Sequence, residues 1–205
     1  FAPAWRDSVL RREWGAAGFA PVVAFVGRIA AEKNLPLAVK AMTRLMEKIP
    51  GTRGVFVGDG PKSRSLRQRH PEFIHVGERV GADLARHYAS ADMFLFPSLT
   101  ETYGNVLPEA MASGLVTVSY DCASAHELVE HGWNGFTAPL RGEAAFLAAV
   151  DEAAVRWNDA TIRLAARDTA QTLSWSAVIS QFERELMGAG RAPAALAPLP
   201  APGLM

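Results

Sequence analysis

Residues 21–49 read PVVAFVGRIAAEKNLPLAVKAMTRLMEKI and contain the pattern that decides the fold. Residues 21–26 are apolar at every position, as expected of a parallel strand that helices cover on both faces. A loop beginning at Gly27 follows, and residues 35–49 then carry apolar side chains at helical spacing. Pro50 and Gly51 end this helix. The stretch therefore predicts one strand–loop–helix unit.

The same alternation repeats along the chain. Strands are predicted over 21–26, 54–58, 73–77, 92–97, 115–120 and 135–139. Helices are predicted between them over 35–49, 61–70, 81–90, 106–113 and 125–131. We therefore expect an α/β fold with a doubly wound, parallel, six-stranded, Rossmann-like sheet and right-handed crossovers. Such sheets bind ligands at the carboxyl ends of their strands, so the loops at that edge are the candidate sites.

The remaining segments predict how the chain is divided. After Pro139 the pattern is helical only, over 143–157, 160–171 and 174–186. Three regions are expected: a short amphipathic helix leading into the first strand at 1–20, the main domain at 21–188, and an Ala- and Pro-rich tail, disordered or a linker, at 189–205. The last helix carries an apolar face that favours a dimer if it is bare, formed by Trp175, Val178, Ile179 and Phe182.

The composition limits the classes of partner. The 205 residues are 49% hydrophobic and carry 21 Lys and Arg against 21 Asp and Glu. A net charge of zero gives no indication of a nucleic-acid partner or an anionic membrane, and the apolar runs are shorter than the roughly 20 residues that span a bilayer. The single Cys122 excludes an internal disulfide. Because the chain begins with Phe1, we expect it to be a piece of a longer protein.

The loop at 27–34, GRIAAEKN, is the first candidate site. Gly27 lets the backbone approach a ligand closely, and Arg28 and Lys33 place two cations at one strand end. Arginine grips phosphate oxygens in pairs and lysine acts as a point charge, so the loop suits a diphosphate. The alternative is a solvated loop in which Lys33 pairs with Glu32 or Glu47.

The loop at 97–114, PSLTETYGNVLPEAMASG, is the most informative. Glu101 lies in the loop and Glu109 in the first turns of the next helix, and each carboxylate can accept two hydrogen bonds from a sugar diol. Gly104 and Asn105 fit a tight turn whose N–H groups suit a phosphate. Two alternatives stay open: the acid and base pair of a glycoside hydrolase, or a Glu109 that only complements the helix dipole beside a solvated Glu101.

Other motifs give weaker indications of a ligand or metal site. GDGPKS at 58–63 begins like a dinucleotide fingerprint but has Ser63 at the third glycine position, which disfavours a nicotinamide cofactor. The basic run that follows fits a solvated helix face better than a nucleic-acid surface. His126 and Glu127 open HELVEH, but Glu130 occupies the place of the second zinc-binding histidine, so no metal site is expected.

Several motifs together resemble the C-terminal half of the group 1 retaining glycosyltransferases. They are GRIAAEKN at 27–34, GDGP at 58–61, ADMFLFPS at 91–98, ETYGNVLPEAMASG at 101–114 and HELVEHGWNGFTAPL at 126–140. The resemblance runs from residue 1 to about 188, and the loop with Glu101 and Glu109 is its most specific part. It implies the C-terminal half of a GT-B fold, which has two Rossmann-like domains. Leu107 and Pro108 depart from the aliphatic residue and leucine of many relatives.

The resemblance also implies a role for each loop residue. Arg28 and Lys33 would bind the diphosphate of a nucleotide sugar and take the place of a metal, which these enzymes generally do not need. Glu109 would bind the ribose hydroxyls, and Glu101 the donor sugar. The backbone of the next turn would hold the sugar and phosphate through Tyr103, Gly104, Asn105 and Val106. The base would rest mainly on backbone near Glu78 and Arg79.

The implied reaction is transfer of a hexose, with retention at the anomeric carbon, to a glycan or lipid acceptor. ETYGNV at 101–106 favours GDP-mannose as donor, with a UDP-sugar as the alternative. A separate N-terminal domain would bind the acceptor, so this chain alone is expected to be inactive. Such enzymes are cytoplasmic, and any contact with the inner membrane would be made by that domain. A sugar-nucleotide epimerase and a non-catalytic nucleotide-sugar-binding module are the rival functions.

Overall fold

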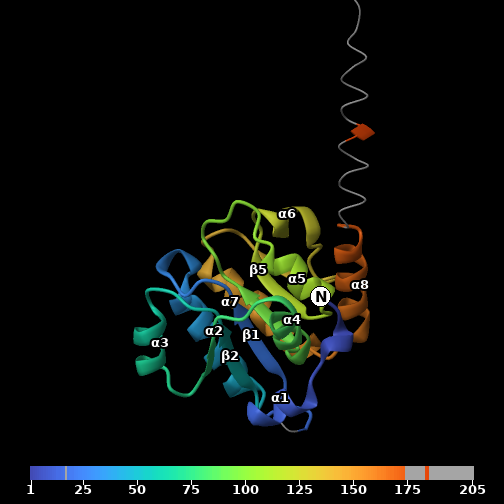
Figure 1. Cartoon of the computed structure of the whole chain (residues 1–205). Helices are drawn as coiled ribbons and strands as arrows, with labels where there is room; N and C mark the ends of the chain where they lie inside the picture. The colour runs from blue at the N-terminus through green and yellow to red at the C-terminus, as the bar shows by residue number, and fades with distance from the viewer. Residues whose placement is uncertain (17, 174–182, 185–205) are drawn as a thin grey trace, which may run out of the picture. The chain divides into compact units, whose positions relative to one another are not determined.

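The computed structural model describes residues 1–16, 18–173 and 183–184. Residues Phe1–Gln171 form a compact unit around a parallel sheet in the order β3-β2-β1-β4-β5-β6 (Figure 1). The strands are β1 Val22–Val26, β2 Arg53–Val57, β3 Ile74–Gly77, β4 Met93–Phe96, β5 Val116–Tyr120 and β6 Phe136–Ala138. This order confirms the predicted doubly wound, six-stranded sheet.

Helices cover both faces of the sheet (Figure 1). Those on one face are α2 Leu35–Lys48, α3 Ser63–Arg69 and α7 Glu143–Arg156. The other face is covered by α1 Ser8–Glu13, α4 Gly81–Ser90, α5 Val106–Ala112, α6 Ser124–Leu128 and α8 Ala160–Gln171. Two short 3₁₀ helices complete the unit, Pro3–Trp5 and Ala31–Lys33.

Strand β1 shows why the sheet is buried on both sides. Val23 and Phe25 face the helices α2 and α7, whereas Val22, Ala24 and Val26 face α4 and α5. All five side chains are buried. Alternate residues of a strand point to opposite faces, and burial of a valine or phenylalanine contributes roughly 1.5–3 kcal/mol. The continuous apolar run is therefore what a central strand requires.

The N-terminal segment differs from the single helix that its pattern predicts. It forms a 3₁₀ turn and the separate helix α1, because the Asp7 carboxylate accepts hydrogen bonds from the N–H groups of Val9 and Leu10 and caps a new helix start. Arg6 and Arg11 then bind the buried carboxylate of Asp92, at 2.7 and 2.8 Å. This carboxylate ties the segment to the start of β4.

Two helix boundaries also differ from the prediction. Helix α3 begins at Ser63 and not at Pro61, because the Lys62 N–H donates to the Ile29 carbonyl outside the helix, at 3.0 Å. Helix α6 ends at Leu128 instead of continuing to residue 131. The buried Asn134 side chain donates to the Leu128 carbonyl at 2.9 Å and so closes that end.

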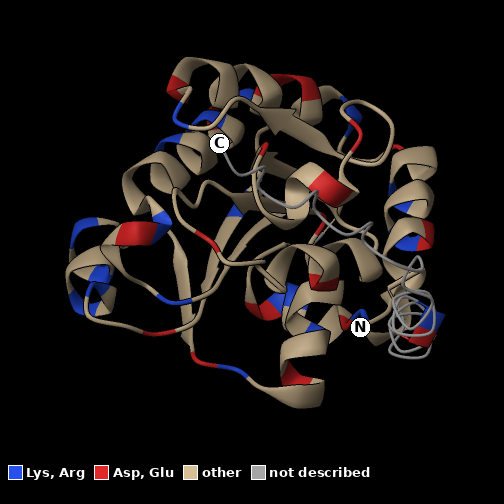
Figure 2. Ribbon diagram, turned by 90° about the horizontal axis from the view of Figure 1, so that it is seen from above, with Lys and Arg blue, Asp and Glu red and all other residues tan. Residues whose placement is uncertain are grey.

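The basic run on α3 is solvated, as predicted. Figure 2 shows these cations on the helix at the left of the view. The side chains are all exposed, and in the described part of the chain none forms an ion pair: Lys62, Arg64, Arg67 and Arg69.

The predicted C-terminal features fall mostly outside the described residues. These features are the helix over 174–186, of which the structure describes 183–184, its apolar face and the tail over 189–205. The predicted dimer therefore stays a prediction. Over the described ranges, the helices are too short or too polar to cross a membrane.

Candidate functional site

The loop after β1 is held against the loop after β2. The Gly27 N–H donates to the Val57 carbonyl at 3.0 Å, and the Ile29 N–H donates to the Asp59 carbonyl at 2.9 Å. Gly58 makes this approach possible, because a Cβ atom there would lie 2.0 Å from the Gly27 oxygen. The GDG motif therefore supports the neighbouring loop by close backbone packing, which explains its glycines without a dinucleotide fingerprint.

A cavity of about 470 Å³, here called the first cavity, opens at the carboxyl ends of β1 and β2. Six residues that the sequence places in the site line it: Gly27, Arg28, Glu78, Arg79, Val106 and Glu109. They come from the loops after β1 and β3 and from the start of α5. Residues that are distant in the sequence thus meet in one concave space.

The first cavity is lined by two cationic side chains, Arg28 and Arg79. The Arg28 guanidinium is 67% exposed and lies 3.7 Å from the Glu32 carboxylate. An exposed pair at that distance contributes little, at most about 1 kcal/mol. Arg79 pairs with Asp83 at 3.2 Å and also donates to the Glu78 carbonyl at 2.9 Å. The Arg28 guanidinium can therefore turn toward an anion at small cost, whereas Arg79 is held by two contacts.

Glu109 is the partly buried carboxylate of the first cavity. Burial raises the pKa of its carboxyl group above the usual 4.5, and a hydrogen bond from the Tyr88 hydroxyl opposes that rise. Tyr88 is fully buried and also lies 3.3 Å from the Val106 carbonyl oxygen. This tyrosine therefore holds the side chain that is expected to bind ribose.

Lys33 and Glu101 are in direct contact. The Lys33 side chain is 19% exposed and that of Glu101 11%, and the Glu101 carboxylate also accepts a hydrogen bond of 2.7 Å from the Ser98 hydroxyl. The alternative in which Lys33 pairs with Glu32 or Glu47 is therefore wrong. A solvated Glu101 is excluded as well. The Leu99 N–H donates to the Glu32 carbonyl at 3.2 Å, which joins the two loops.

The turn at 103–105 leaves hydrogen-bond donors free. The carbonyl oxygens of Tyr103 and Gly104 accept hydrogen bonds from the backbone N–H and the hydroxyl of Ser124, at 2.9 and 3.3 Å. Within the described ranges, the N–H groups of Tyr103, Gly104 and Asn105 donate to no protein acceptor. Successive free N–H groups in a turn form an anion-binding concavity.

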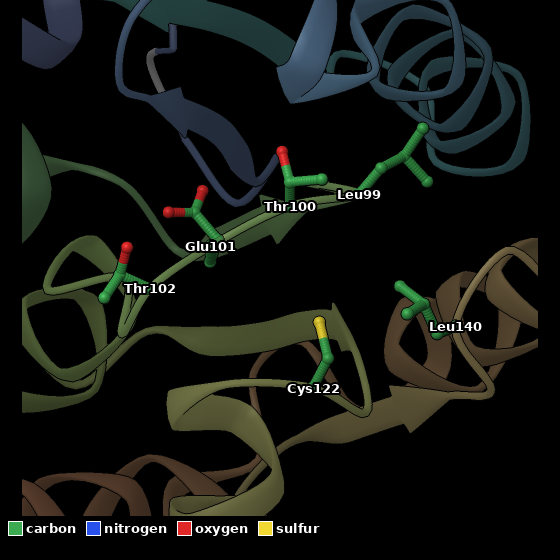
Figure 3. A pocket seen from close by; sticks show the side chains of 6 residues that line it. All are labelled: Leu99, Thr100, Glu101, Thr102, Cys122 and Leu140. Carbon is green, nitrogen blue, oxygen red and sulfur yellow. The ribbon is translucent and has the colours of Figure 1, made fainter.

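A second cavity of about 530 Å³ is lined by Glu101 and by residues that follow β4, β5 and β6. Its lining combines two hydroxyls, the carboxylate and apolar side chains, namely Leu99, Thr100, Glu101, Thr102, Cys122 and Leu140 (Figure 3). Burial, together with the nearby carboxylates of Glu101 and Asp121, raises the pKa of the Cys122 thiol. A protonated thiol is a poor nucleophile, so this environment does not activate Cys122.

The arrangement disfavours hydrolase chemistry. Glu101 and Glu109 line different cavities, and Glu101 is bound to a lysine and a serine hydroxyl. A hydrolytic pair would face one substrate bond from both sides. Over the described ranges, no cluster of three His, Cys, Asp or Glu is placed to hold a metal ion. His126 and His131 pair separately, with Asp121 and Glu152.

Sequence reasoning missed several residues that support the site. Ser98 follows β4 in the same loop as Glu101, so its position was a usable signal. Asp59 lines the first cavity from the GDG turn. Tyr88 and Ser124 act from separate elements, and no spacing in the sequence connects them with Glu109 or Gly104.

Residues 20–154 match the family described as Glycosyl transferases group 1. The chain belongs to this family. It is 39% identical over 152 residues to a GDP-mannose-dependent alpha-mannosyltransferase of Mycolicibacterium smegmatis, a match that covers 73% of this chain and 39% of that protein. It is 37% identical over 144 residues to a protein of the same description from Mycobacterium tuberculosis, covering 68% and 35%.

The fold of this group 1 glycosyl transferase chain is also found in solved structures. Anabaena HepE in complex with UDP superposes with a TM-score of 0.74 at 24% identity, over 92% of this chain and 56% of that one. The sheet and helices described above are thus the Rossmann-like half of a GT-B glycosyltransferase. The chain spans little more than a third of the two mannosyltransferases that it resembles.

Proposed function

We propose that this chain is the donor-binding domain of a retaining glycosyltransferase that transfers mannose from GDP-mannose to a glycan or lipid acceptor. One observation carries the proposal. A single cavity gathers six of the residues that the sequence assigns to the donor site, from positions up to 82 apart, 27 to 109. A chance surface hollow would not select this set.

The diphosphate binds between Arg28 and Lys33. Gly27 has open space where a side chain would stand, so the ligand can lie directly on the backbone there. As the bond to the anomeric carbon breaks, negative charge develops on the departing diphosphate. Two cations and the free N–H groups of the 103–105 turn stabilise that charge more than the charge of the bound donor.

The nucleoside occupies the first cavity. The Glu109 carboxylate accepts hydrogen bonds from the ribose hydroxyls, and the base rests beside Glu78 and Arg79. Two carboxylates near the base, Asp59 and Glu78, suit a ring that presents N–H donors, as guanine does. The names of the two curated relatives support the same donor.

The donor sugar lies at Glu101, between the two cavities. Ser98 fixes one oxygen of that carboxylate, and the other oxygen remains for sugar hydroxyls. The acceptor is bound by a further domain, in keeping with the share of the mannosyltransferases that this chain spans. The chain by itself therefore binds donor and transfers nothing.

A thermal-shift panel tests the proposal. GDP and GDP-mannose are expected to raise the melting temperature of the chain more than UDP-glucose or ADP-glucose at equal concentration. Lys33→Ala should abolish the shift, whereas Lys62→Ala, which removes an exposed lysine just before α3, should keep it. Equal shifts for all nucleotides would refute the GDP preference, and no shift with any nucleotide would refute donor binding.

A second experiment separates the transferase from its rivals. The longer protein that contains this domain should form a mannosylated product only when both donor and acceptor are present. An epimerase would convert the donor alone. A non-catalytic binding module would show the thermal shift but release no GDP from GDP-mannose with any glycan or lipid acceptor.

A further inference from the structure

Ser124 connects two loops of the site. It is the first residue of α6, follows β5, and is fully buried. Its backbone N–H donates to the Tyr103 carbonyl at 2.9 Å, and its hydroxyl donates to the Gly104 carbonyl at 3.3 Å. One residue of the loop after β5 thus holds two successive carbonyl groups of the turn after β4.

These two hydrogen bonds set the direction of the opposite peptide groups. The peptide bonds here are trans, so the C=O and the N–H of each peptide lie on opposite sides. The Leu107 N–H also donates to the Gly104 carbonyl, at 3.0 Å. With the Tyr103 carbonyl held by Ser124 and the Gly104 carbonyl held by Ser124 and Leu107, the N–H groups of Gly104 and Asn105 point away from these donors. Neither donates to an acceptor among residues 1–16 and 18–173.

The turn has little freedom to adopt another conformation. Gly104 has φ +86°, and a Cβ atom there would lie 2.9 Å from the ring of Phe96, so the turn rests directly on that ring. On the other side, Ala123 has φ +50° and ψ −133°, which residues with a side chain rarely adopt. This conformation directly precedes Ser124 and aims its N–H at the turn.

We propose that Ser124 is a positioning residue for donor binding: it holds the 103–105 turn so that the N–H groups of Gly104 and Asn105 donate to the β-phosphate of a nucleoside diphosphate. The inference rests on the proposed function and adds a residue to it. Donors that are already oriented need no reorganisation when the anion arrives, so a turn held in advance binds the phosphate more tightly than a mobile one.

Calorimetric titration of the 205-residue chain with GDP and GMP tests this role. Ser124→Ala removes the hydroxyl donor and keeps the backbone hydrogen bonds to the turn, so we expect it to weaken GDP binding about threefold to fivefold, as for one lost hydrogen bond between neutral groups. GMP has no β-phosphate, so its affinity should change by less than about twofold. Ser124→Cys keeps a side chain of similar size with a weak S–H donor, so its GDP affinity should lie between those of the wild type and Ser124→Ala. If the alanine variant does not fold, the cysteine variant serves for the same comparison of GDP with GMP.

Ser90→Ala is the matched control. Ser90 is equally buried, and its hydroxyl accepts a hydrogen bond of 3.0 Å from the Asp7 N–H, far along the chain from the turn. This variant should lose stability and keep both affinities. Unchanged GDP binding in Ser124→Ala, or an equal loss for GDP and GMP, would overturn the positioning role alone. A wild-type chain that binds neither nucleotide would overturn the proposed function and this role together.

Discussion

The ammonium group of Lys33 contacts the carboxylate of Glu101, although 68 positions separate the two residues. Lys33 follows β1 and Glu101 follows β4, and these strands are neighbours in the sheet. In the free chain, the cation expected to bind phosphate is therefore neutralised by the carboxylate expected to bind the sugar. If the proposed diphosphate binds here, we expect it to compete with Glu101 for the Lys33 ammonium group.

This contact gives two substitutions opposite effects on GDP binding. Glu101→Gln frees the Lys33 cation, so GDP, which has no sugar for Glu101 to bind, should bind about threefold to tenfold more tightly. Lys33→Ala should weaken GDP binding at least tenfold. Calorimetric titration of both variants measures the two effects.

Lys40→Ala serves as the control for the loss of a lysine. Lys40 forms an exposed ion pair with Glu143 between α2 and α7, so its removal should leave the GDP affinity unchanged. A Glu101→Gln variant that binds GDP less tightly than the wild type would contradict the competition between carboxylate and phosphate.

Substitution of Glu109 by glutamine should raise the stability of the fold and weaken GDP binding. Burial raises the pKa of Glu109, so the folded chain holds this proton more tightly than the unfolded chain. The carboxylate therefore costs stability above its pKa. Glu109→Gln should raise the melting temperature at pH 7 and have little effect at pH 3.5, where the carboxyl group is protonated in both states.

The same substitution should weaken GDP binding about tenfold at pH 7, because an amide oxygen replaces a carboxylate that accepts from two hydroxyls. The difference from the wild type should shrink as the pH falls through the raised pKa. Melting curves and GDP titrations at pH 3.5 to 7.5 measure both effects. A variant that is less stable than the wild type at pH 7 would show that burial does not disfavour the charge.

Asp92 should be a large single contributor to stability. Its side chain is 2% exposed and accepts hydrogen bonds from Arg6, Arg11 and the Val22 N–H, the last at 2.9 Å. Asp92→Asn leaves buried guanidinium charge without its partner, so urea unfolding should show a loss of about 3–5 kcal/mol.

A partly exposed carboxylate provides the comparison. Asp151 pairs with Arg44 and Lys48 between α2 and α7, and its side chain is 26% exposed. Asp151→Asn should cost about 1 kcal/mol or less in the same assay. Equal losses for the two variants would contradict the role assigned to the buried cluster.

The backbone conformation of Ala123 predicts that glycine at this position stabilises the fold. Its φ of +50° with ψ of −133° strains any residue that has a Cβ atom, at about 1–3 kcal/mol. Ala123→Gly removes this strain. It also makes the unfolded chain more flexible, which lowers the free energy of unfolding by about 0.4–1 kcal/mol. Unfolding in urea should show a net gain of about 1 kcal/mol, and a loss of stability would mean that the strain is absent.

The sheet could be predicted from the sequence because its signals are local. Apolar runs such as 21–26 and 93–97 each fit a strand, and the predicted strands agree with the structure to within about one residue at each end. The errors lie where a side chain outside the helix decides where the helix begins or ends. Asn134 closes α6, and Asp7 starts α1, and neither effect is visible in the spacing of apolar residues.

The candidate site could likewise be predicted only in part. Arg28, Lys33, Glu101 and Glu109 could be selected because they lie at the ligand-binding edge of the predicted parallel sheet and their motifs resemble a family. Their mutual contacts could not be predicted, since the order of the strands determines which loops are neighbours. The roles of the supporting residues follow from packing alone, as for Ser124.

The central claim, that the first cavity and the loop of Lys33 bind a nucleotide-sugar donor, is tested most directly by calorimetric titration of the chain with GDP-mannose. Saturable binding at one site per chain, at least tenfold weaker in Lys33→Ala and in Glu109→Ala, is the predicted result. No binding of GDP-mannose, or equal affinity in the wild type and both variants, would contradict it.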